Sequence, residues 1–242
     1  MKQQLYYYVK SFLLVVALNL NYFVLKAQDR VMIISFEPQM FRCEWCEGFY
    51  ESTGWSYREM TLRFRSALDQ NIFQTLQKNG YQPVSLYESD QTRFANEQGY
   101  IYKSIAYDYE LIDENGNELE KPFNGIENGQ VVSRPAFNQK LIKVKITNSN
   151  LLNTLYKTYL ADYFLFIAET DVLPPVYNAY KKTEMPMLAV HVSLYDKTGR
   201  LVYAGIIKEF FPGNWNDPQK IFKRIMPVVA EKIVKSLKFN KN

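Results

Sequence analysis

A pair of cysteines three positions apart, Cys43 and Cys46 in the run CEWC, is the sharpest chemical pattern in the chain. In thiol–disulfide oxidoreductases, one thiolate of such a pair attacks a disulfide and the other resolves the intermediate. Those cysteines open a helix, whereas an irregular stretch with two glycines separates Cys46 from the first expected helix here. An oxidising compartment would instead join the two cysteines in a local disulfide. The pattern favours a structural disulfide, with redox catalysis as the alternative.

Metal binding and acid–base catalysis find less support. Structural zinc takes four ligands, of which the cysteine pair supplies two, and the one histidine, His191, cannot complete the set. His191 alternates with Val190 and Val192, which indicates a half-exposed strand residue. A general base needs a nucleophile and an orienting acid nearby, and the sequence has no G-x-S-x-G, S-x-x-K or H-E-x-x-H motif. We therefore expect no catalytic residue, no metal ion and no cofactor, and the sequence favours a protein that is not an enzyme.

Two acidic residues, Glu169 and Asp171, share one face if the strand before them continues. Such a pair can exchange protons or hold a cation. The prolines that follow, Pro174 and Pro175, favour a strand that emerges into solvent at this point. Both acids remain candidate binding residues. The three tryptophans are the candidate contacts of a carbohydrate-binding surface, namely Trp45, Trp55 and Trp215.

Nucleic-acid and nucleotide binding have no basis in the sequence. The chain has 29 basic and 25 acidic side chains, and its segment 1–27 holds three of the lysines and no acid. The remainder is thus close to neutral and lacks the clustered Lys and Arg of a nucleic-acid surface. Neither G-x-G-x-x-G nor G-K-[ST] occurs, so the common nucleotide-binding loops are not expected.

The segment 1–27 has the pattern of a secretory signal peptide. Lys2 and Lys10 precede an apolar run from Phe12 to Leu18, and Ala27 is suited to cleavage. A membrane-spanning helix needs about 20 mostly apolar residues, and asparagines interrupt this shorter segment. We expect cleavage near Ala27, a periplasmic or secreted protein without a transmembrane span, and one α/β domain over residues 28–242.

The expected elements form a single mixed β-sheet with helices packed on it, an α/β (α+β) fold. A helix is predicted from Ser56 to Gly80 because its apolar residues recur at helical spacing. Residues 39–54 are expected to be irregular, and residues 113–135 to form a long loop or hairpin tip. Strands are predicted at 31–36, 83–87, 106–112, 140–147, 163–168, 187–195 and 201–211, a further helix near 152–159, and a final helix over 218–237 that Pro227 kinks.

The second half of the chain resembles known envelope domains. The segment Leu152–Ala168, with Ala161-Asp162-Tyr163 leading into an apolar strand, is similar to an element of the amino-terminal domain of the TolB translocation protein. It also resembles the periplasmic domain of the curli secretion channel and the outer-membrane activators of penicillin-binding proteins. In those proteins a hairpin and a carboxy-terminal helix follow, as do Asp196–Arg200 and Pro218–Leu237 here.

The whole chain after the leader resembles an uncharacterised family of exported bacterial proteins. The likeness rests on the run VMIISFEPQMF, on Arg58–Arg65, on Tyr102–Tyr107, on Gly129–Ser133 and on Asp162–Asp171. It implies an envelope location and this fold, and no activity. We therefore expect a non-enzymatic envelope protein that binds another protein or an envelope polymer. The alternatives are a thiol–disulfide oxidoreductase using Cys43 and Cys46 and a carbohydrate-binding module.

Overall fold

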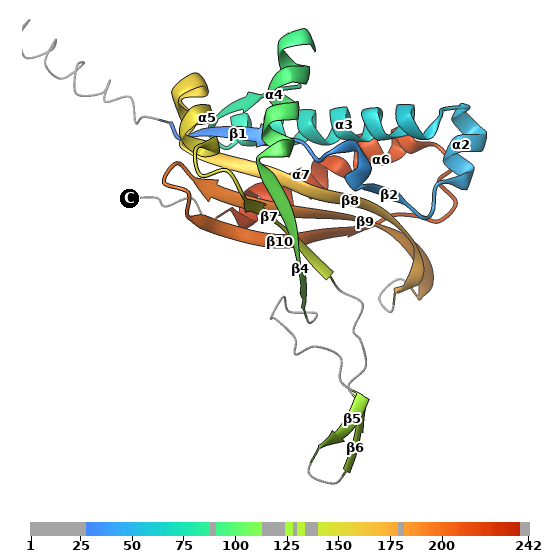
Figure 1. The fold of residues 1–242 in the computed structure, drawn as a ribbon. Coiled ribbons are helices and arrows are strands. Elements are labelled where there is room, and N and C mark those ends of the chain that lie inside the picture. The colour runs from blue at the N-terminus through green and yellow to red at the C-terminus, as the bar shows by residue number, and fades with distance from the viewer. Residues whose placement is uncertain are drawn as a thin grey trace, which may run out of the picture.

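A mixed sheet forms the centre of the fold. The computed structural model describes residues 28–87, 91–112, 124–127, 130–133, 140–178 and 182–237, so the expected signal peptide lies outside the described residues. The strand order is β10-β9-β8-β1-β3, and β2 pairs with a later part of β8 (Figure 1). β1 is parallel to β3 and β8, whereas β8, β9 and β10 are antiparallel, so the sheet is mixed as expected. The strands are β1 (Arg30–Ile34), β2 (Phe41–Cys43), β3 (Gln82–Ser85), β8 (Tyr163–Asn178), β9 (Thr183–Asp196) and β10 (Leu201–Phe210).

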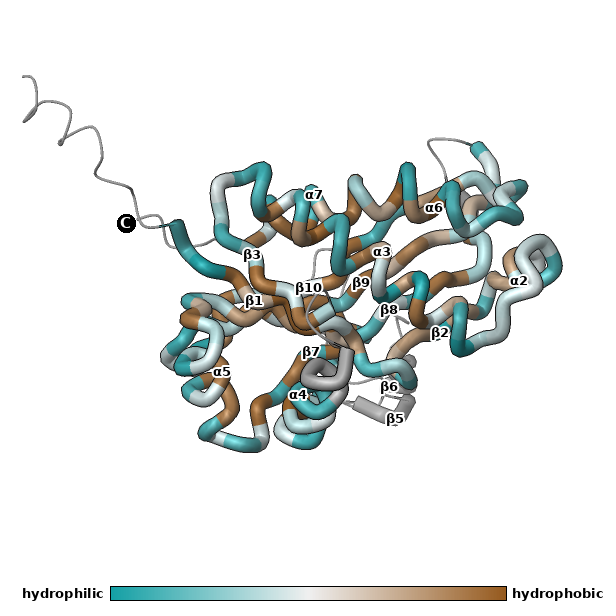
Figure 2. The backbone as a smooth tube through the Cα atoms, turned by 90° about the horizontal axis from the view of Figure 1, so that it is seen from above, coloured by the Kyte–Doolittle hydropathy of each residue, from teal (hydrophilic) through white to brown (hydrophobic). Residues whose placement is uncertain are grey.

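One face of the sheet is covered by α3 (Tyr57–Lys78) together with α6 (Pro218–Arg224) and α7 (Met226–Ser236). Ser56 is the N-cap residue of α3 and forms a capping box with Glu59. The side chain of each residue accepts a hydrogen bond from the backbone N–H of the other, which the first turn would leave unpaired. The predicted apolar stripe of α3 faces the core. Five of its members, Met60, Phe64, Leu68, Ile72 and Leu76, are at most 1% exposed, and the sixth, Ala67, is partly buried against the same core. Hydrophobic segments accordingly gather where the strands lie under these helices (Figure 2).

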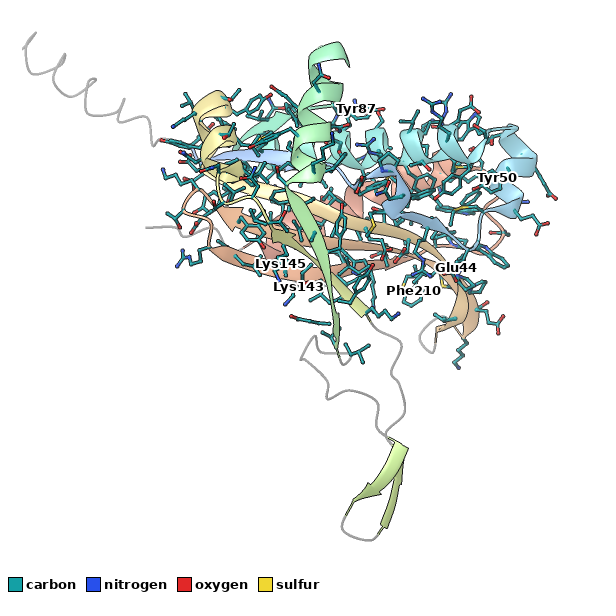
Figure 3. All side chains as sticks on the ribbon, in the orientation of Figure 1. Glu44, Tyr50, Tyr87, Lys143, Lys145 and Phe210 are labelled. Atoms are coloured by element: carbon teal, nitrogen blue, oxygen red, sulfur yellow. A yellow bond between two sulfur atoms is a disulfide. The ribbon has the colours of Figure 1, made fainter. Side chains whose placement is uncertain are left out.

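The opposite face carries α4 (Gln91–Lys103), α5 (Leu151–Tyr159) and an antiparallel ribbon of β4 (Ile105–Leu111) and β7 (Lys140–Ile146). Lys143 and Lys145 of β7 pair with Glu110 and Asp108 of β4, which joins the two strands of the ribbon (Figure 3). Between them, the predicted excursion at 113–135 contains a hairpin of β5 (Asn124–Glu127) and β6 (Gln130–Ser133). The rest of that segment lies outside the described residues.

Three local expectations were wrong. The segment 39–54 is structured, because a 3-10 turn (Pro38–Met40), β2 and a short helix α2 (Glu47–Thr53) follow one another there. The strand starting at Tyr163 does not end at Ala168 but continues to Asn178. The final helix is two helices that meet at Ile225, with Pro227 in the first turn of α7, where a proline loses no helical hydrogen bond.

The carboxyl end of β1 is the point where the chain changes faces. β1 leads to β3 through α3 on one face, and β3 leads to β8, on the other side of β1, through elements on the opposite face. Asp69 holds β1 and β3 to α3 at this point. Its carboxylate accepts hydrogen bonds from Ser35 (2.9 Å), which follows β1, and from Ser85 (2.5 Å) of β3. All three side chains are buried.

Asp69→Ala should lower the free energy of unfolding by about 2–4 kcal/mol, because two buried hydroxyls lose their acceptor. Urea unfolding followed by tryptophan fluorescence measures this. Gln70→Ala, at the exposed neighbouring position, is the control and should change stability by less than about 0.5 kcal/mol. An Asp69→Ala protein as stable as the control would show that this network does not hold β1 and β3 to α3.

Candidate functional site

The structure brings Glu169, Asp171 and His191 together inside the sheet. Residues 164, 166 and 168 of β8 belong to the core under α5 and the ribbon, and 165 and 167 to the core under α3. The pairing with β9 slips by one residue between Ile167 and Glu169, so Ala168 is a bulge. Because side chains alternate along a strand, one extra residue moves Glu169 and Asp171 to the ribbon side, where His191 lies.

The sequence predicted the shared face of the two carboxylates and misplaced their surroundings. Glu169 is 5% exposed, Asp171 4% and His191 4%, so none of them lies at an exit into solvent or on a half-exposed face. The prolines fail to end the strand because a second slip in pairing, between Leu173 and Val176, accommodates them. No local signal in the sequence marks the bulge at Ala168, which is what buries the two acids.

His191 belongs to a row of β9 side chains that satisfies the free edge of β7. The Ile142 N–H donates to His191 Nδ1 (3.0 Å), and the Val144 N–H donates to Ser193 Oγ (3.1 Å). The Tyr195 hydroxyl donates to the Val144 carbonyl (2.6 Å). These three side chains replace the partner strand that β7 lacks on this edge, and they supply the hydrogen bonds that buried backbone groups require.

The contact with Ile142 determines the tautomer of the neutral imidazole. A ring nitrogen that accepts an N–H bond carries no proton, so neutral His191 has its proton on Nε2. Nε2 faces Asp171 Oδ2 at 3.4 Å and Glu169 Oε2 at 3.9 Å. The histidine therefore points an N–H at the carboxylates and has no basic nitrogen to offer a substrate.

The same proton decides whether the cluster suits a metal ion. One donor atom from each of Glu169, Asp171 and His191 lies within 4.8 Å of the others, a spacing that resembles a ligand set. A histidine ligand normally donates its second N–H to an acceptor, whereas here the second nitrogen, Nδ1, faces a backbone donor. Ligation through Nε2 would need an imidazolate or the loss of the Ile142 bond. The residues do not fit a metal.

A shared proton accounts for the carboxylates better than a cation does. Burial, followed by repulsion from Asp171 and a hydrogen bond to it, raises the pKa of Glu169 to about 7. Arg42 lies opposite Asp171 in the β2–β8 pairing and attracts both carboxylates. Asp171 Oδ1 is buried without a hydrogen-bond partner among the described residues, and a proton between two carboxyl groups satisfies such an oxygen. The cluster is thus a structural proton-sharing site beneath the ribbon.

Cys43 and Cys46 are joined in a disulfide, with their Cα atoms 5.5 Å apart, a usual distance for this bond. The expectation that irregular chain follows Cys46 was wrong, because Cys46 is the N-cap residue of α2. Cys46 is 2% exposed and Cys43 is half-buried. In a redox pair the attacking thiolate has to be accessible, and the cysteine at the helix start is the buried one here.

The three tryptophans lie around α2 and do not form an open aromatic platform. Trp45 precedes α2 and is 41% exposed. Trp55 follows α2, stacks on Phe222 at 6.5 Å, and has the Arg63 guanidinium 4.2 Å from its ring centroid. Trp215 neighbours Asn216, whose backbone carbonyl accepts a hydrogen bond from Ser52 of α2. Two of the three rings are partly buried against the core that these helices cover.

The helix α3 lies beside the α6–α7 pair (Figure 2). An open groove runs between α3 and this pair. It consists of two hollows of about 470 and 310 Å³ that both include Asn71. Sequence reasoning missed this groove because its two walls come from opposite ends of the domain sequence. Its lining is mostly polar: Arg63, Ser66, Ala67, Gln70, Asn71, Gln74, Thr75, Lys78, Asn79, Gln219, Phe222, Lys223, Pro227, Glu231 and Lys235.

Comparisons with known proteins give only distant structural likenesses. No family model and no curated protein matches the chain. The lipoprotein GNA1162 from Neisseria meningitidis is similar at 12% identity and a TM-score of 0.34, over 86% of this chain and 99% of that one. The hypothetical protein CT253 from Chlamydia trachomatis is similar at 8% identity and a TM-score of 0.42, over 88% of this chain and 99% of that one.

Within the described residues, no helix has the length and apolar character needed to cross a membrane.

Glu169→Gln should change how stability depends on pH. The folded protein holds a proton on Glu169 up to about pH 7, whereas the unfolded chain releases it near pH 4.5. The free energy of unfolding of the native protein should therefore fall as pH rises from about 4.5 to 7, and level off above that. A neutral glutamine removes this fall, so the variant should gain on the order of 1–3 kcal/mol relative to the native protein between pH 4.5 and 8.

Urea unfolding at pH 4.5, 6 and 8 measures the effect, with Glu51→Gln on exposed α2 as the matched control. The control should follow the native pH dependence. If Glu169→Gln follows it as well, the buried pair does not share a proton.

Proposed function

We propose that this protein is an exported binding protein of the bacterial cell envelope and that it holds its partner in the groove along α3. The observation that carries the proposal is the groove itself, an open surface feature lined mostly by polar residues. The groups that could do chemistry have structural tasks: the histidine and both carboxylates lie under the ribbon, and the cysteines are paired. The signal-like segment 1–27 and the likeness to TolB-type envelope domains support export.

The length of the groove suits an extended partner. Arg63 and Lys78 lie at its two ends on α3, and a helical segment of that length extends about 22 Å along its axis. Gln70 and Gln74 lie between them, exposed and on the same side of the helix. A chain lying along α3 could therefore contact several exposed side chains in succession.

The alternative, a thiol–disulfide oxidoreductase, has one supporting observation in the position of Cys46 at the start of α2. The burial of that same sulfur opposes it, since its thiolate is shielded from a substrate disulfide. The experiment below includes a variant that separates the two functions.

Crosslinked capture of the tagged full-length protein from the envelope fraction of its own cells tests the proposal. The Gln70→Tyr, Gln74→Tyr variant fills the groove and should lose the main captured component at least tenfold. The Cys43→Ser, Cys46→Ser variant should retain it.

The matched control is Thr154→Tyr, Thr158→Tyr, which places the same two rings at the same spacing on exposed positions of α5, across the sheet. It should capture as the native protein does. Equal capture by the groove-filled variant would rule out the groove, and loss through the cysteine variant alone would move thiol exchange to first place. Absence of the protein from both the envelope fraction and the culture medium would refute export.

A further inference from the structure

The charges of the groove define the chemistry of its ligand more closely than its shape does. Its lining holds four cations, Arg63, Lys78, Lys223 and Lys235, and one acid, Glu231. Glu231 is paired with Lys235 at 3.6 Å. Lys78 and Lys223 are exposed and form no ion pair within the described part of the chain. Two unpaired cations and the Arg63 guanidinium thus face the groove, although the chain without its leader is close to neutral.

Arg63 is held in place by its neighbours. Its guanidinium lies 4.2 Å from the ring centroid of Trp55, which itself stacks on Phe222, a residue of the groove wall. A cation over an aromatic face keeps its outward N–H groups available for carboxylate or phosphate oxygens. The Arg63 guanidinium over its ring at one end and exposed lysines farther along match a ligand that carries repeated negative charges.

Between the cations, amide side chains line the groove. Gln70, Gln74 and Gln219 offer both donors and acceptors, as neighbouring hydroxyl groups of a sugar require. The core of a protein–protein interface is instead depleted in Lys and Glu and built around aromatic or aliphatic anchors. Only Ala67, Phe222 and Pro227 are apolar here. The composition therefore disfavours a folded protein or an amphipathic peptide as the occupant.

We infer that the groove between α3 and the α6–α7 pair binds an extended anionic polysaccharide. Its carboxylates would pair with Arg63, Lys78 and Lys223, and its hydroxyls would bind the glutamine amides between them. This inference rests on the proposed function and specifies its ligand.

Isothermal titration of the full-length protein with three polymers tests the inference. The probes are alginate, a linear chain of uronic acids, dextran as a neutral polysaccharide, and poly-L-glutamate as an acidic polypeptide. We expect alginate to bind at least tenfold more tightly than either of the others, and its affinity to fall as salt is added.

Two variants with the same change in net charge locate the binding. Lys78→Gln, Lys223→Gln should weaken alginate binding at least tenfold, whereas Lys145→Gln, Lys157→Gln, on exposed positions of the other face, should change it less than twofold. Equal losses in both variants would indicate nonspecific charge attraction and overturn the inference. So would poly-L-glutamate binding as tightly as alginate, or no binding of alginate. If envelope capture still depends on Gln70 and Gln74 in that case, the proposed function stands and only the ligand class is wrong.

Discussion

The free edge of β7 is the constraint on which the second half of the fold depends. A ribbon of two strands has unpaired backbone groups on both outer edges, and burying one edge without partners would cost more than its packing returns. Here His191, Ser193 and Tyr195, spaced by two along β9, supply the missing donors and acceptors. The ribbon can thus cross the sheet at an angle and cover the core beneath α5 without adding a strand to the sheet.

The bulge at Ala168 follows from the same arrangement. It turns Glu169 and Asp171 to the ribbon side, where the Nε2 proton of His191 faces them. Two buried carboxylates are tolerable because one proton, one imidazole N–H and the nearby Arg42 reduce their mutual repulsion. The Glu169–Asp171–His191 cluster resembles an acid–base or metal site. Its arrangement is explained by the need of buried backbone groups of β7 for hydrogen-bond partners.

Patterns of short range predicted much of the fold. The stripe from Met60 to Leu76, the apolar run of β8 and the β9–β10 hairpin were identified because each is recorded in consecutive residues. The sequence could not show that Ala168 is a bulge, since register depends on which strand pairs with β8. It could not show that His191 is buried, because its acceptor role depends on β7, a strand distant in the sequence. The groove was hidden for the same reason, as α3 and α7 meet only in the folded chain.

With the reactive groups occupied in this way, the groove on the other face of the sheet is the surface that we propose to bind a ligand. Its cations and amides lie on α3, α6 and α7, and the apolar sides of these helices pack on the sheet. We propose that the interior of the sheet has a structural role and that the helical layer binds the ligand. This proposal depends on His191 being a structural acceptor and not a base or a ligand.

Nitrogen-15 NMR of the single histidine tests that assignment most directly. A neutral tautomer with its proton on Nε2, and no change on addition of Zn²⁺ or Mn²⁺, is the result expected if His191 caps the edge of β7. A proton on Nδ1, or a shift or broadening of the Nε2 signal with metal, would contradict it and return the Glu169–Asp171–His191 cluster to consideration as a reactive site.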